Sequence, residues 1–121
     1  MTSAELKGRT KRFHIEIIKL CERLPKNAAG FELAKQLIRS AGSVAANYRA
    51  ACRAKSKADF IYKLDVVIEE ADESMYWLEI IGESGLCKVE ETLPLVNEAN
   101  ELVSIFTAAA ITSKAKYRTK E

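Results

Sequence analysis

Apolar residues recur along this chain every three or four positions, with polar residues between them. This spacing places the apolar side chains on one face of a helix, because an α-helix has about 3.6 residues per turn. Proline, glycine and polar residues interrupt the pattern at three places. The pattern predicts helices over residues 3–23, 27–53, 57–84 and 90–113.

Capping residues mark the expected starts of the first three helices. Ser3 and Asn27 are expected to cap the first and second helices, and Pro25 separates them because proline cannot continue the hydrogen-bond ladder. Ser56, followed three residues later by Asp59, has the arrangement of a capping box. The third helix should therefore begin directly after Ser56.

The ends of the last two helices follow from similar signals. Gly85 suits the left-handed position after a helix, and Leu86 can close a Schellman-type contact. Thr92 as the cap of the fourth helix would place Pro94 in its tolerated first turn. The tail over residues 114–121 is polar, basic and terminal, so we expect it to be frayed.

The second helix is expected to pack through a heptad seam with small residues in its middle. The expected seam is Phe31, Ala34, Ile38, Ala41, Ala45, Tyr48 and Cys52. Small side chains let another helix approach closely. Gly42 lies among them and otherwise costs about 1 kcal/mol relative to alanine, so close backbone approach is predicted there.

These elements predict an all-α fold in a single domain. Four helices with connections of a few residues give an antiparallel up-down-up-down four-helix bundle. The third helix carries a second apolar stripe at Ile61, Ile68 and Met75 beside its main seam. Two stripes exceed what one core needs, so we expect a homo-oligomer.

Charge is strongly segregated along the chain although the net charge is only +2. Residues 1–63 carry a net charge of +9, residues 64–113 carry −10 and residues 114–121 carry +3. One explanation is that basic helices pair with acidic ones within the bundle or between subunits. The other is a basic face that binds the phosphates of RNA or DNA.

Both explanations assign roles to particular side chains. The candidate phosphate contacts are Lys7, Arg9, Lys11, Arg12, Lys19, Arg23, Lys26, Arg53, Lys55 and Lys57. The candidate ion pairs join Arg39, Arg49 and Arg53 to the acidic cluster around Glu69, Glu70 and Glu73. Trp77 is expected to pack in the core or at an interface.

The sequence offers no catalytic or metal-binding motif. Its one histidine, His14, lacks the Glu-x-x-His context of bundle metal sites. Cys21, Cys52 and Cys87 are odd in number and far apart, which favours buried packing roles. We expect no enzyme activity, no cofactor and no metal. No apolar run is long enough for a membrane span, so a cytoplasmic location is expected.

The stretch QLIRSAGSVAANYRAACRAKSKADFIYKLDVVIEEADESMYWLEII closely resembles the bacterial four-helix-bundle family encoded within intervening sequences of large-subunit ribosomal RNA genes. The resemblance covers roughly residues 13–110. Its central elements are Ser43-Val44, Ala46-Asn47-Tyr48-Arg49, Ser56-Lys57 and Trp77-Leu78-Glu79. Many members have proline where Ala45 or Ala46 falls, so this chain suggests a subgroup with an unkinked second helix.

The resemblance implies a pentameric ring of bundles without enzyme activity. Related accessory proteins of retroelements form such rings and bind nucleic acid and a reverse transcriptase, which makes these the partners to consider. The central motif is expected to hold the bundle or its subunit interface together, through Arg39, Gly42, Asn47, Tyr48, Arg49, Glu69, Glu70, Glu73 and Trp77. The rival interpretation is a protein-interaction scaffold that binds no nucleic acid.

Overall fold

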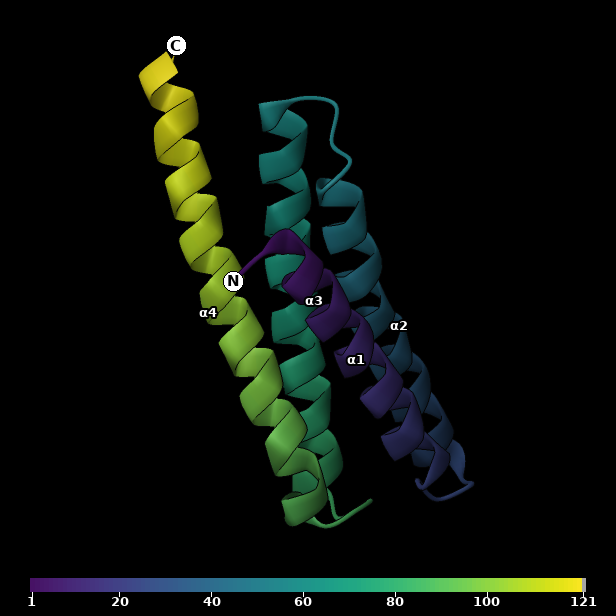
Figure 1. Ribbon diagram of the computed structural model, residues 1–121. Helices are drawn as coiled ribbons and strands as arrows, with labels where there is room; N and C mark the ends of the chain where they lie inside the picture. The colour runs from purple at the N-terminus through teal and green to yellow at the C-terminus, as the bar shows by residue number, and fades with distance from the viewer. Residues whose placement is uncertain (121) are drawn as a thin grey trace.

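The computed structural model describes residues 1–120, with side chains through Arg118. It contains four helices, α1 (Ser3–Glu22), α2 (Ala28–Ala51), α3 (Lys57–Glu83) and α4 (Val89–Lys120). They run alternately up and down, joined by short connections (Figure 1). The predicted all-α four-helix up-down bundle is therefore confirmed, and α2 is one continuous helix.

Side chains cap three of the helices. Asn27 caps α2 by accepting a bond from the Gly30 amide at 2.9 Å, and Ser56 caps α3 by accepting from the Asp59 amide at 3.1 Å, as predicted. The cap of α1 is Thr2 rather than Ser3. Thr2 and Glu5 form a reciprocal capping box, which satisfies two amides that would otherwise lack partners.

The connection between α3 and α4 combines one confirmed and one wrong prediction. Gly85 has a φ of 81°, and the Leu86 amide donates to the Ile81 carbonyl at 3.2 Å, which completes the predicted Schellman motif. Thr92 is not a cap, because α4 already begins at Val89 and Pro94 lies inside the helix. Thr92 instead donates its hydroxyl to the Val89 carbonyl.

The prediction that α4 ends near Ser113 is wrong, whereas fraying of residues 114–121 stays a prediction. The helix continues to Lys120, and Glu121 lies outside the described residues. The added turns run beside the first part of α3 (Figure 1). Lys114 contributes an ion pair there, with its Nζ 3.2 Å from Asp65 Oδ1 on α3.

The core seam of α2 lies one residue away from the predicted one at most positions. Ala41 and Tyr48 are buried as predicted, but the other buried positions are Gly30, Leu37, Ser40, Val44 and Ala51. Phe31 is 61% exposed, and Cys52 is also exposed. The Ser40 hydroxyl lies 2.8 Å from that of Ser74 on α3, so two buried polar groups satisfy each other.

The three cysteines differ in burial. Cys21 is buried, and burial raises the pKa of its thiol to about 11. Cys87 is partly buried, and desolvation also raises its pKa. Cys52 is exposed, so the expectation of a buried packing role is wrong for this residue.

The turn between α1 and α2 depends on a glycine. Gly30 is buried, and a Cβ atom at this position would collide with the carbonyl oxygen of Pro25. Gly8 on α1 has open space where its Cβ would lie. The same substitution should therefore have opposite effects at the two positions.

We expect Gly30→Ala to lower the free energy of unfolding by about 1–3 kcal/mol, because the added methyl overpacks a rigid turn. Gly8→Ala should raise it by up to about 1 kcal/mol, because alanine is the better helix former. Urea unfolding followed by circular dichroism measures both. Equal changes in the two variants would contradict the packing of this turn.

Candidate nucleic-acid interface

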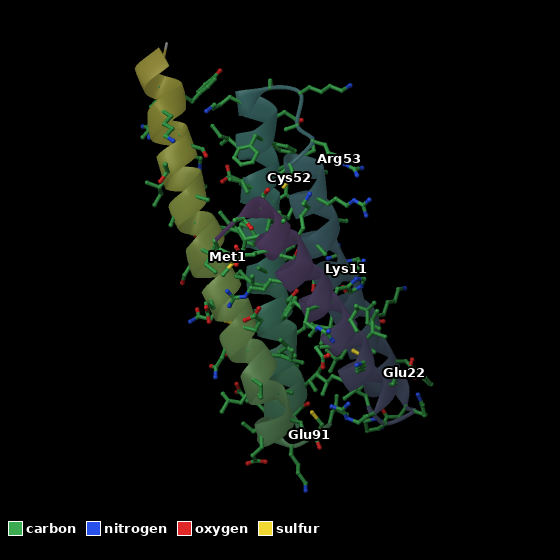
Figure 2. All side chains as sticks on the ribbon, viewed as in Figure 1. Met1, Lys11, Glu22, Cys52, Arg53 and Glu91 are labelled. Atoms are coloured by element: carbon green, nitrogen blue, oxygen red, sulfur yellow. The ribbon has the colours of Figure 1, made fainter. Side chains whose placement is uncertain are left out.

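A groove runs along the outer side of the contact between α1 and α2. From α1 it is lined by Lys7, Gly8, Lys11 and His14, and from α2 by Gly42, Ala45, Ala46 and Arg49, with Arg53 from the turn that follows α2. Its volume is about 570 Å³. Lys11 and Arg53 both lie on the side of the molecule formed by these two helices (Figure 2). We call this cleft the α1–α2 groove.

Small residues create the groove. On each helix the lining positions recur at spacings of one, three or four, so they form one face. Glycine and alanine on these faces leave space between the longer cationic side chains. Gly42 packs under the ring of His14, since a Cβ atom there would lie 3.0 Å from His14 Nε2. The predicted close approach at Gly42 is thus to a side chain and not to a helix backbone.

The groove is cationic and contains no carboxylate. Four of its nine lining residues are lysine or arginine, and none is acidic. Within the part of the chain whose side chains are described, Lys7, Lys11, Arg49 and Arg53 form no ion pair. Four cations that share a concave surface attract an anion, because a cleft with low-dielectric walls concentrates their field.

Arg9, another predicted phosphate contact, points to α4 instead. Its guanidinium binds both carboxylate oxygens of Glu98, at 2.7 and 2.8 Å, and also lies 2.8 Å from Glu101. These hydrogen bonds raise the pKa of Arg9 above its ordinary value, with Glu98 as the main cause. Arg9 therefore joins α1 to α4, which otherwise have few contacts.

Four further candidates on α1 and its following turn lie outside the groove. Arg12 and Lys19 both pair with Glu16 on their own helix, at 3.3 and 3.7 Å. Arg23 donates to the carbonyl of Lys19, near the end of α1. Lys26 lies by a separate small pocket in the turn to α2. The groove thus contains only part of the predicted set of phosphate contacts.

The acidic cluster of α3 is matched by one arginine and not by three. Arg39 lies 2.6 Å from Glu73 and 3.4 Å from Glu70, which confirms that part of the prediction. Trp77 is partly buried and donates its indole N–H to Glu73 at 3.2 Å. The predicted pairing of Arg49 and Arg53 with this cluster is wrong, and Glu69 has no ion pair among the side chains described.

Two further residues of the central motif differ in their contacts, since Tyr48 contacts another helix and Asn47 bonds within α2. Tyr48 is buried, and its ring centroid lies 4.9 Å from that of Phe106 on α4. Burial raises the pKa of the Tyr48 phenol, with a bond to Cys52 adding to the effect. Asn47 donates to Ser43 on its own helix, at 2.9 Å to the carbonyl and 2.8 Å to the hydroxyl.

The connection between α2 and α3 carries the remaining basic candidates. Lys55 lies in a second cleft, between α2 and α3, which it shares with Arg49, Arg53, Asp59 and Lys63. Asp59 and Lys63 form an ion pair at 2.6 Å, which lowers the pKa of Asp59. Lys57 is exposed at the first residue of α3 and lines neither cleft.

Two groove residues were not among the phosphate contacts predicted from the sequence: His14 was given no role, and Arg49 was assigned to the acidic cluster of α3. Their helical spacing carried the signal. His14 follows Lys7 and Lys11 by seven and three residues, and Arg49 lies seven residues after Gly42. Each helix thus carries its small and basic residues on one shared face.

The described residues support neither a metal site nor a membrane-spanning helix. Among side chains 1–118, no three His, Cys, Asp or Glu residues converge in a way that suits a metal ion. No helix within residues 1–120 is long and apolar enough to cross a membrane.

Comparison with known proteins places the chain in a family. Residues 4–108 match the family described as 23S rRNA-intervening sequence protein. The chain belongs to this family. A solved structure of a protein of unknown function from the S23 ribosomal protein family of Bacteroides thetaiotaomicron is 32% identical, with a TM-score of 0.80. The match covers 86% of this chain and 96% of that one. No curated protein matches the chain.

Both the matched family region and the matched structure span most of the bundle, so the fold is shared over its core. Neither description names an enzyme.

The Arg9 contact gives a prediction about stability. We expect Arg9→Ala to lower the free energy of unfolding by about 1–2 kcal/mol. The substitution removes a bidentate ion pair between α1 and α4 and leaves the partly buried carboxylate of Glu98 without this partner. Arg12→Ala is the matched control on the same helix and should cost less than about 0.5 kcal/mol, since its pair with Glu16 is exposed. Equal losses in chemical denaturation would contradict the role of Arg9 as the α1–α4 contact.

Proposed function

We propose that this member of the 23S rRNA-intervening sequence protein family binds the phosphate backbone of a nucleic acid through the α1–α2 groove, without catalysing a reaction. The observation that carries the proposal is a concave surface with four cations and no carboxylate. RNA is the first ligand to test, because the family and the matched S23 ribosomal protein family are both named for ribosomal components.

The groove chemistry suits binding that ignores base sequence. Arginine forms paired hydrogen bonds with phosphate, and lysine supplies a point charge. The small residues between the cations have no side-chain donors or acceptors, so Lys7, Lys11, Arg49 and Arg53, with His14, supply the polar side chains of the groove. We expect the four cations to contact the phosphate backbone. About four phosphate contacts to a single strand predict a log–log salt slope near −3.

Assembly between copies of the chain is the second candidate function. It is favoured by the exposed carboxylates of α3 and α4, which carry charge opposite to that of the groove, among them Glu69, Asp72, Glu79, Glu83 and Glu90. Exposed apolar side chains, including Phe31, Tyr62, Tyr76 and Ile111, also suit contacts with another protein. A ring of five copies, and a reverse transcriptase as partner, stay proposals based on the resemblance.

We expect labelled single-stranded RNA to bind in fluorescence anisotropy and to lose roughly 50-fold in affinity between about 50 and 200 mM salt. Lys11→Glu with Arg49→Glu should abolish this binding, because two of four groove cations become anions. Lys35→Glu with Lys88→Glu is the matched control. It makes the same change in net charge at two exposed lysines outside the groove and should retain most of the binding.

Three results would overturn the proposal. One is an absence of binding at the lower salt concentration, and another is an equal loss in both double variants. Light scattering on the same samples supplies the third. If only the groove variant dissociates an oligomer, Lys11 and Arg49 belong to a subunit contact, and assembly becomes the better supported function.

A further inference from the structure

The α1–α2 groove is not an isolated cleft. The second cleft, between α2 and α3, has a volume of about 350 Å³ and shares Ala46, Arg49 and Arg53 with the groove. The two clefts therefore meet across the outer surface of α2. Where they meet, α2 presents Ala46 and Ala50, whose short side chains form a low ridge, with Arg49 and Arg53 beside them.

Resting on the proposed function, we propose that the ligand is a single strand that lies in the α1–α2 groove, crosses α2 over Ala46 and Ala50, and ends in the α2–α3 cleft beside Lys55. Arg49 and Arg53 line both clefts, so they would contact the phosphates at the crossing. Single-strand binding typically combines a positively charged groove that follows the backbone with rings on which the bases stack, and these clefts supply the charged groove.

The shape of the surface favours one strand over a duplex. Lys7 and Lys11 line the groove from one side and Arg49 and Arg53 from the other, so cations can approach one backbone from two directions. A duplex presents its phosphates on a convex cylinder and cannot place them all in a cleft between two neighbouring helices. His14 carries the only ring among the lining residues of the two clefts, so base stacking contributes little.

The path also sets a length for the ligand. It crosses two helix-to-helix spacings of about 8–10 Å each. At 3.4 Å or more per nucleotide of a strand, that distance corresponds to at most about six nucleotides. Affinity should therefore rise with oligonucleotide length up to about six and then level off.

Asp59 gives the path an internal control. Its carboxylate lies in the α2–α3 cleft, where it pairs with Lys63 and opposes a phosphate. It lines only that cleft and is absent from the α1–α2 groove. Removal of this charge should strengthen the binding of strands long enough to reach the second cleft and leave shorter ones unchanged.

The test compares a dinucleotide, a hexanucleotide and an octanucleotide of uridine by competition anisotropy, together with an RNA duplex. We expect Lys55→Gln to reduce the salt slope for the hexanucleotide by about 0.7, the value for one lost contact to a single strand, and to leave the dinucleotide unchanged. Asp59→Asn should raise hexanucleotide affinity by roughly fivefold or less. The backbone N–H of residue 59, which donates to the Ser56 hydroxyl, is unchanged by this substitution, so the cap of α3 is preserved. Lys35→Gln removes the same charge at an exposed lysine outside both clefts and is the matched control, so it should leave the salt slope unchanged.

The possible results separate this inference from the proposed function. Binding that is lost in the Lys11→Glu, Arg49→Glu variant but insensitive to both Lys55→Gln and Asp59→Asn would overturn the path and leave the groove. A duplex that binds as tightly as the hexanucleotide would also overturn it. An absence of binding by every oligonucleotide at about 50 mM salt would overturn both proposals.

Discussion

The packing of α1 against α2 through small residues is the constraint on which the candidate site depends. Gly30 lets the chain turn tightly past Pro25, and Gly42 accommodates the ring of His14 between the two helices. The short side chains at Ala45 and Ala46 then leave space on the outer side of the contact. Larger side chains at these positions would extend into the groove and reduce its volume.

The same geometry divides the basic residues of the first half of the chain into two groups. Several cations on other faces of α1 and α2 meet carboxylates, as Arg9 meets Glu98 and Arg39 meets Glu73. These pairs join helices that are oppositely charged, and they account for part of the segregation along the sequence. Cations on the faces that line the groove, such as Lys11 and Arg49, meet none in the described chain. Charge segregation thus serves both packing and an exposed basic surface.

Helical periodicity and capping residues were sufficient to predict the bundle, the number of helices and most of their ends. They failed where tertiary contacts decide the outcome. Residues beyond Ser113 look like a tail in isolation, but Lys114 meets Asp65 on a neighbouring helix. Arg49 was assigned to the acidic cluster because charge counting cannot give the direction of a side chain around the helix. The buried face of α2 was misplaced for the same reason. Phe31 and Leu37 belong to two overlapping sets of residues with helical spacing, and spacing alone does not show which set faces the core.

The most direct test of this account is a titration of the ¹⁵N-labelled protein with a single-stranded hexauridylate, followed in two-dimensional ¹⁵N–¹H correlation spectra. Binding in the groove should shift most strongly the amide signals of the groove-lining faces of α1 and α2, around Lys11, His14, Gly42 and Arg49. Signals from the acidic outer faces of α3 and α4, around Glu79 and Glu90, should change little. Shifts concentrated on those acidic faces, or an absence of shifts at any groove residue, would contradict binding in the groove.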